Sequence, residues 1–130
     1  MSILRQEKLK GPVVSLPTFV DENHHLETDK QRKHIRWLLE NGIGVDGNGV
    51  LLIAGGYGEG YFLDDRELFT LTDILAEETN GRASTMIGVF DLNARTAVRR
   101  AKYAANAGID FLELGLPHYS CPSEEDVYLY

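Results

Sequence analysis

The stretch VLLIAGGYGEGYFLDDRE, residues 50–67, decides the fold of this chain. It begins with five apolar residues that show no alternation, which is typical of a strand in a parallel sheet covered on both faces. A glycine-rich turn follows at residues 55–60, and Asp64 with Glu67 three positions later predicts a capping box at the start of a helix. A strand, a glycine turn and a helix in this order indicate one βα unit of a parallel α/β protein.

Similar units flank this stretch. Apolar runs predict further strands at residues 12–16, 84–90 and 109–116. Helices are expected to start at Thr28 or Asp29, at Asp64, at Asn93 and at Ser123, because these residues can act as N-caps. The last helix has only begun when the sequence stops at Tyr130. We therefore expect a single domain over residues 1–130, which is either a fragment ending inside its fourth helix or a chain whose sheet edges are covered by a partner.

Composition narrows the class of protein. The 130 residues carry a net charge of −7, so no nucleic-acid partner is expected, because phosphate binding needs a basic face. Cys121 is the single cysteine, which precludes an intrachain disulfide and fits a reducing compartment. No apolar run approaches the roughly 20 residues of a membrane span, and the charged N-terminus lacks a signal core. The sequence thus predicts a cytoplasmic protein without membrane contact, and it predicts no cofactor and no metal site.

Three motifs resemble the dihydrodipicolinate synthase / N-acetylneuraminate lyase family. Residues 55–59 (GGYGE) resemble its Gly-Thr-Thr-Gly-Glu loop after the second strand, and residues 117–122 (PHYSCP) resemble its Pro-Tyr-Tyr-x-x-Pro segment after the fourth. Residues 17–19 (PTF) stand where the family usually has Thr-Pro-Phe. The likeness extends over residues 11–130. It implies an α/β fold that is the first half, about four βα units, of a TIM (β/α)8 barrel, with parallel strands in the order 1-2-3-4 and helices on the outer face only.

The resemblance also implies an activity. The complete protein is expected to be a Schiff-base lyase, aldolase or dehydratase acting on pyruvate or a related 2-oxo acid, in a homo-oligomer such as a dimer or tetramer. In the family, the Schiff-base lysine lies on the sixth strand and the principal tyrosine on the fifth, both beyond Tyr130. The lysines of this chain precede the first strand or fall on predicted helices. We therefore expect the 130-residue chain alone to be inactive and to form no Schiff base.

Candidate site residues follow from the same resemblance. The backbone N–H groups of Gly56 and Tyr57 are expected to bind the substrate carboxylate, as glycine-rich turns can. Gly56 lacks the hydroxyl with which the family's first threonine relays protons, and the Tyr57 hydroxyl is a candidate replacement. Tyr119 matches a family tyrosine that reaches into the neighbouring subunit's site, which makes it a second catalytic candidate. Each assignment has an alternative. The loop with Gly56 and Tyr57 is then a turn that needs glycine for its backbone angles, and Tyr119 is an aromatic residue of a subunit interface.

Glu113 is a further polar residue expected inside the barrel. Strand alternation places Leu112, Leu114 and Leu116 toward the helices and Glu113 on the opposite face. A buried carboxylate needs a partner. A structural pair is the expected role of Glu113, and a site role is the alternative. His118, which replaces the first tyrosine of the family segment, is expected to be a packing residue.

Three other functions remain open from the sequence. Residues 54–59 (AGGYGE) match the Ala-Gly-Gly-x-Gly-Glu loop of 5-dehydro-4-deoxyglucarate dehydratases, which favours a sugar-acid substrate. A nucleotide- or phosphate-binding module would be a doubly wound fold. Against it, Tyr61 occupies the third glycine position of the dinucleotide fingerprint, and the loop follows the second strand. The third possibility is a non-catalytic half-barrel that assembles with another chain.

Overall fold

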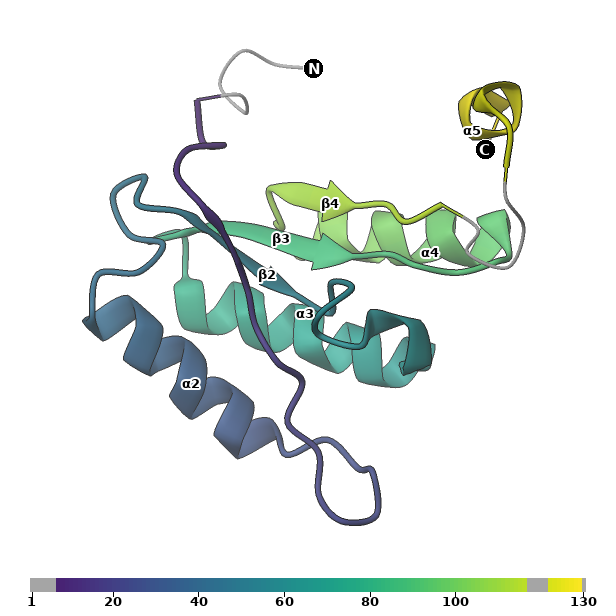
Figure 1. Ribbon diagram of the computed structural model, residues 1–130. Coiled ribbons are helices and arrows are strands. Elements are labelled where there is room, and N and C mark those ends of the chain that lie inside the picture. The colour runs from purple at the N-terminus through teal and green to yellow at the C-terminus, as the bar shows by residue number, and fades with distance from the viewer. Residues whose placement is uncertain (1–6, 117–121, 130) are drawn as a thin grey trace.

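The strands form one parallel sheet. The computed structural model describes residues 7–116 and 122–129. Its four strands lie in the order β1-β2-β3-β4, and each is hydrogen-bonded to its predecessor (Figure 1). Their bounds are β1 (Val13–Ser15), β2 (Val50–Ile53), β3 (Ser84–Gly88) and β4 (Phe111–Glu113). The strand order expected for a barrel is confirmed, and the described strands show no reversal of the kind that a doubly wound module requires.

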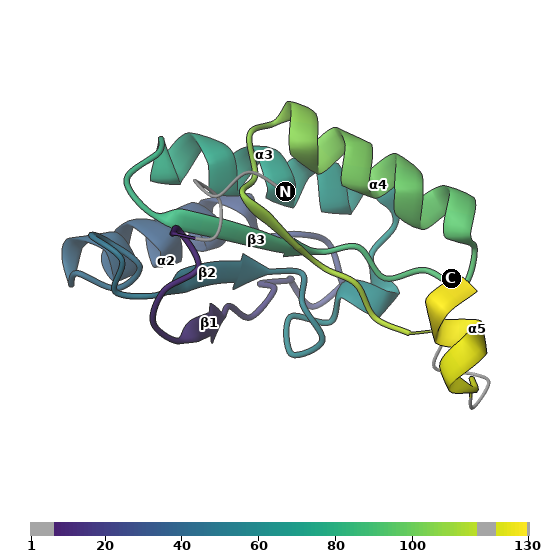
Figure 2. The same ribbon diagram turned by 90° about the horizontal axis from the view of Figure 1, so that it is seen from above.

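Helices cover one face of this sheet. They are α2 (Thr28–Glu40), α3 (Asp65–Thr79) and α4 (Ala94–Asn106), which lie side by side on the same face (Figures 1 and 2). A short 3-10 turn, η1 (Gly60–Phe62), precedes α3, and α5 (Glu124–Leu129) stands apart from the other helices. Within the described residues, no helix is long and apolar enough to cross a bilayer. The opposite face of the sheet carries no helix in the described part of the chain, as in the inner face of a (β/α) barrel.

The hydrophobic core lies between the sheet and the helices. Leu51 and Ile53 of β2 and Ile87 of β3 are fully buried there. Buried side chains of the helices pack against them: Ile35, Leu38, Leu39, Leu68, Leu71, Ile74, Leu75 and Ala104. Each fully buried aliphatic side chain contributes roughly 1.5–3 kcal/mol. This core holds the strands in register and so fixes where their carboxyl ends lie.

Three of the predicted helix starts are confirmed by their hydrogen bonds, and one is wrong. At the start of α5, Ser123 Oγ accepts from the N–H of Asp126 at 3.2 Å, and the N–H of Ser123 donates to Asp126 Oδ2 at 2.9 Å. Asp64 and Glu67 form the predicted capping box, and Asn93 accepts from the N–H of Arg95. Thr28 and Asp29 do not cap α2, because Thr28 is already its first helical residue. Glu27 is the N-cap residue, but its side chain makes no capping hydrogen bond. It directly follows an antiparallel bridge between residues 20 and 26.

The predicted strands at residues 12–16, 84–90 and 109–116 are longer than the observed ones. β3 ends at Gly88, and the next residue but one, Phe90, packs back against it. β4 spans Phe111–Glu113, because only these residues pair with β3. Apolar character alone cannot mark these ends, since apolar residues follow each strand: Leu16 after β1, Val89 and Phe90 after β3, and Leu114 after β4.

Candidate functional site

The glycine-rich loop leaves β2 at its carboxyl end, where the sites of (β/α) barrels lie. Ala54, the residue between strand and loop, has a φ of +51°, in the left-handed region that non-glycine residues seldom adopt. Gly60 donates a hydrogen bond from its N–H to the carbonyl of Gly55 at 3.1 Å. The Thr18 hydroxyl donates to the carbonyl of Gly58 at 2.6 Å. The loop is therefore held both internally and by the segment that follows β1.

Close packing accounts for some of these glycines. A Cβ atom on Gly60 would lie 1.9 Å from the carbonyl oxygen of Ala54, and one on Gly58 would lie 2.7 Å from the carbonyl oxygen of Leu16. A Cβ on Gly56, in contrast, would meet nothing within 4 Å. The structure thus requires glycine at two loop positions for packing, but packing gives no reason for glycine at position 56.

Gly56 and Tyr57 present unpaired backbone donors. Neither N–H group donates a hydrogen bond to any described residue, and both residues are exposed. Adjacent free N–H groups in a turn can bind an anion. The Tyr57 side chain is 83% exposed, so the described residues do not enclose its hydroxyl in the water-poor pocket that favours proton relay. Tyr119 and His118 lie outside the described residues, and their proximity to this loop stays a prediction.

Two aromatic rings lie beside the loop. Tyr61 and Phe90 stack with ring centroids 4.4 Å apart, and Phe90 is buried. A Cβ atom on Gly88 would lie 2.0 Å from the carbonyl oxygen of Ala54, and one on Gly115 would lie 2.1 Å from the Phe90 ring. The segments that follow β2, β3 and β4 are therefore packed together at one end of the sheet.

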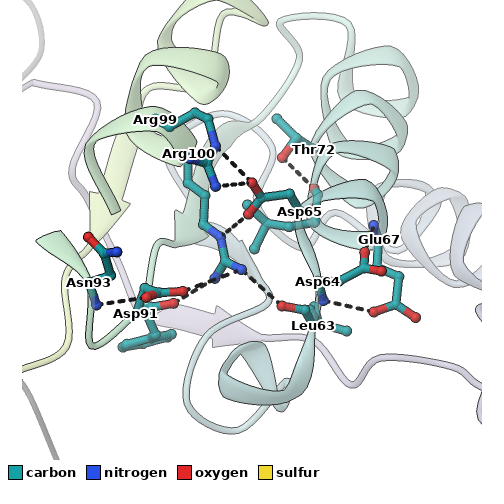
Figure 3. A network of polar contacts seen from close by, with 11 residues as sticks. Leu63, Asp64, Asp65, Glu67, Thr72, Asp91, Asn93, Arg99 and Arg100 are labelled. Atoms are coloured by element: carbon teal, nitrogen blue, oxygen red, sulfur yellow. Dashed lines mark hydrogen bonds and ion pairs between the residues drawn. The ribbon is translucent and has the colours of Figure 1, made fainter. Parts of the chain in front are cut away.

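Arg100 of α4 connects these segments (Figure 3). Its side chain is only 6% exposed. The guanidinium donates from Nε to Asp65 Oδ1 at 2.8 Å, from Nη1 to the carbonyl of Phe90 at 2.6 Å, and from Nη2 to the carbonyl of Leu63 at 3.0 Å. Nη2 also lies 3.7 Å from Asp91 Oδ2. One side chain thus joins the start of α3 to the segment that follows β3.

Arg100 is not among the site residues predicted from the sequence. A signal was present, because the buried side of the alanine-rich helix α4 consists of Ala97, Arg100 and Ala104, at spacings of three and four. An arginine in such a stripe must find buried acceptors. The sequence does not show which acceptors these are, since the partners lie 10 to 37 residues away.

Because the Asp65 carboxylate is paired with two arginines, we expect the free energy of unfolding to depend on pH in the acid range. Burial raises its pKa, but hydrogen bonds from Arg100 and Arg99 outweigh burial and hold the pKa below the ordinary value of 3.8. A lowered pKa in the folded state gives stability that is present above about pH 4 and lost as pH falls through the lowered value. We expect Asp65→Asn to cost about 2 kcal/mol at pH 7 and much less near pH 2. Urea unfolding of both proteins across this pH range tests the prediction, which a constant difference would contradict.

Glu113 points away from the helices, as predicted. Leu112 and Leu114 line an apolar groove with Val98 and Ala101 of α4, so the intervening Glu113 is on the face of the sheet away from the helices. Its Oε2 atom is buried and has no hydrogen-bond partner among the described residues. The structural pair expected from the sequence is therefore not found in the described part of the chain.

The described lysines lie where the sequence placed them. Lys30 and Lys33 are in α2 and Lys102 is in α4. Lys8 pairs with Asp110, just before β4, with 2.6 Å between Nζ and Oδ1, and Lys10 precedes β1. None of them lies on a strand. Within residues 7–116 and 122–129, no group of three or more histidine, cysteine, aspartate or glutamate side chains is arranged to hold a metal ion.

Four parallel strands in sequential order, helices on one face and a glycine loop at the strand ends are the arrangement of the first part of a (β/α) barrel. A profile of the dihydrodipicolinate synthetase family matches residues 8–130, and the chain belongs to that family. Among curated relatives, the 4-hydroxy-tetrahydrodipicolinate synthase of Methanothermobacter thermautotrophicus is 36% identical over 115 residues, which cover 88% of this chain. The enzyme of the same name from Bacillus subtilis is 31% identical over 108 residues.

Solved structures agree on the fold. N-acetylneuraminate lyase from Mycoplasma synoviae superposes with a TM-score of 0.84 at 22% identity, over 95% of this chain and 41% of that one. The dihydrodipicolinate synthase of Acinetobacter baumannii complexed with pyruvate superposes with a TM-score of 0.83 at 22% identity, over 93% of this chain and 40% of that one. The chain spans about two fifths of the length of the curated relatives, 39% and 36% for the two named above. It corresponds to the N-terminal part of the family barrel.

Proposed function

We propose that the chain contributes the substrate-carboxylate loop of a Schiff-base lyase, aldolase or dehydratase that acts on pyruvate or a related 2-oxo acid in the complete protein. The observation that carries the proposal is the pair of free N–H groups on Gly56 and Tyr57, at the carboxyl end of β2. Membership of the dihydrodipicolinate synthetase family supports it. So do two structural neighbours that are described as complexes with pyruvate.

We assign the following roles to the site residues. The N–H groups of Gly56 and Tyr57 bind the carboxylate, and the remaining catalytic groups come from elsewhere in the complete, homo-oligomeric protein. The hydroxyls of Tyr57 and Tyr119 are the candidates in this chain for proton transfer. With Tyr57 exposed as it is here, its hydroxyl acts only when further protein or substrate covers it.

Binding to the loop is directly measurable. When the 15N-labelled chain is titrated with pyruvate, the amide signals of Gly56 and Tyr57 are expected to shift most. Lactate, which keeps the carboxylate but lacks the oxo group, serves as a control for simple anion binding. Pyruvate-induced shifts confined to other segments, such as the lysine-bearing helices, would contradict the proposed site.

Imine chemistry supplies a second test. An imine requires a deprotonated amine held in a dry pocket, and the described lysines lie on helices or before β1. Borohydride reduction in the presence of pyruvate is therefore expected to leave the intact mass of the 130-residue chain unchanged. A longer form of the protein that includes a strand-end lysine is expected to gain one reduced adduct. A stoichiometric adduct on the 130-residue chain would refute this assignment.

A sugar-acid dehydratase is the second candidate. The observation that favours it is the open space at Gly56, where the loop carries no hydroxyl although a side chain would meet nothing within 4 Å. Residues 54–59 also match the loop of the 5-dehydro-4-deoxyglucarate dehydratases. Turnover of a sugar acid, but not of pyruvate with an aldehyde acceptor, by the complete protein would select this reaction.

A further inference from the structure

Glu113 carries a buried carboxylate oxygen without a partner. Among the described residues, three buried side-chain atoms lack hydrogen-bond partners: Ser15 Oγ, Gln31 Nε2 and Glu113 Oε2. Only the last of these belongs to an ionisable group. Buried polar atoms in folded proteins almost always have a hydrogen-bond partner. Burying a carboxylate without a partner costs more free energy than burying an unpaired neutral polar group. An unpaired carboxylate oxygen therefore points to a hydrogen-bond donor that the described residues do not supply.

The position of this oxygen relates it to the glycine loop. In the sheet register Glu113 is opposite Gly88, against which the Ala54 carbonyl and the Phe90 ring pack closely. Glu113 Oε2 lies 2.7 Å from the position that a Cβ atom on Gly55 would occupy. Gly55 directly precedes Gly56, whose N–H group is free. The carboxylate and the anion-binding N–H groups are thus neighbours at the same end of the sheet.

These two neighbours place opposite demands on a ligand. The N–H groups of Gly56 and Tyr57 favour a negative group, whereas the Glu113 carboxylate repels one and accepts hydrogen bonds. Pyruvate meets only the first demand, because it has a carboxylate but no hydrogen-bond donor. A 2-oxo acid with a hydroxyl group beyond the oxo carbon meets both, since its hydroxyl can donate to the carboxylate while its acid group binds the loop.

We propose that Glu113 determines specificity by accepting a hydrogen bond from a hydroxyl group of a hydroxylated 2-oxo acid whose carboxylate is bound at Gly56 and Tyr57. This inference rests on the proposed function and deepens it, because it assigns the substrate class. A site built around a buried acceptor discriminates strongly against the analogue that lacks the donor, since that analogue leaves the acceptor unpaired.

A matched pair of small acids tests the proposal on the 130-residue chain. 3-Hydroxypyruvate and 2-oxobutyrate differ by a hydroxyl in place of a methyl group, and their affinities are read from the amide shifts of Gly56 and Tyr57. The wild-type chain is expected to bind 3-hydroxypyruvate about tenfold more tightly, as hydrogen bonds to charged groups allow. In Glu113→Gln and Glu113→Leu this ratio is expected to fall toward one while pyruvate still binds. An equal ratio in wild type and both variants would overturn the role of Glu113.

The outcomes separate this inference from the function on which it rests. If no 2-oxo acid shifts the signals of Gly56 and Tyr57, the proposed function fails and the inference fails with it. If pyruvate shifts them but the wild-type chain does not prefer 3-hydroxypyruvate, only the inference fails. L-alanine keeps the carboxylate but carries an ammonium group on its second carbon, where the 2-oxo acids carry the oxo group. Tighter binding of L-alanine, lost in Glu113→Leu, would overturn the hydroxyl assignment in favour of a cationic ligand.

Thermal unfolding gives a readout that needs no ligand. Replacing a residue that is kept for binding at the expense of stability makes the protein more stable. Replacing a residue that is held in a structural pair makes the protein less stable. Glu113→Leu is therefore expected to raise the midpoint of thermal unfolding by about 3 °C, because an unpaired buried oxygen is removed. A fall in the midpoint for both Glu113→Leu and Glu113→Gln would show a structural pair and overturn the proposal.

Discussion

Replacing Arg100 with methionine is expected to lower the free energy of unfolding by about 3–5 kcal/mol. Methionine keeps most of the aliphatic length but supplies no donor. The substitution leaves the carbonyl groups of Phe90 and Leu63 without the bonds they accept from the guanidinium. It also leaves the Asp65 carboxylate with Arg99 as its remaining arginine partner. Each buried acceptor that is left without a donor costs about 1–3 kcal/mol. The combined loss is therefore a large fraction of the free energy of unfolding of a small domain.

Arg99→Met is the matched control. Arg99 donates to the same carboxylate of Asp65, from Nε at 2.8 Å and also from Nη2, but its side chain is 56% exposed. Exposed ion pairs contribute at most about 1 kcal/mol, so this variant is expected to lose little stability. Urea unfolding of the two variants, followed by circular dichroism, measures the difference. Equal losses in both would mean that burial of Arg100 does not distinguish the two arginines.

Arg100→Lys separates charge from geometry. Lysine keeps the positive charge, but a single ammonium cannot reproduce the planar fork that meets three acceptors on two different segments. An intermediate loss of stability is expected, together with shifted amide signals in the loop after β2. Arg100 holds the residues that follow this loop and the residues that follow β3. Its effect on Gly56 and Tyr57 is therefore indirect.

The fold was predictable because its signals are local. The unalternating apolar run of β2 and the capping box of Asp64 and Glu67 depend on residues close together in sequence, and both are confirmed. The strand order follows from family resemblance and from the rule that consecutive barrel strands pair. The ends of β3 and β4 were misplaced, because they depend on which residues find a partner strand and not on how apolar those residues are.

The candidate site was predictable only in part. The position of the glycine loop at a strand end follows from the pattern of the sequence. The structure adds that the N–H groups of Gly56 and Tyr57 donate to no residue in its described part. The polar partners could not be predicted. Arg100 meets acceptors on two segments distant in sequence, and Glu113 Oε2 has no partner among the residues that the structure describes, although burial led us to expect one. Such pairings depend on how the helices pack on the sheet, and no short pattern of residues encodes that.

Gly88→Ala is the second substitution expected to have a large effect. A Cβ atom at this position would lie 2.0 Å from the carbonyl oxygen of Ala54 and 2.5 Å from the Phe90 ring. The oxygen belongs to the backbone at the end of β2, so it cannot move without shifting the glycine loop. Overpacking of this kind costs about 1–3 kcal/mol and occasionally more. We expect a loss near the top of this range, together with shifted amide signals for Gly56 and Tyr57.

Gly56→Ala is the control within the same loop, because its Cβ atom would meet nothing within 4 Å. The change in the free energy of unfolding is expected to be below about 1 kcal/mol, and it can be a gain, since alanine reduces the freedom of the unfolded chain. Urea unfolding of the two variants measures the contrast. If Gly88→Ala lost as little stability as Gly56→Ala, the Ala54 carbonyl would have to move freely. The glycine loop would then not be held in the close packing on which its fixed anion-binding geometry depends.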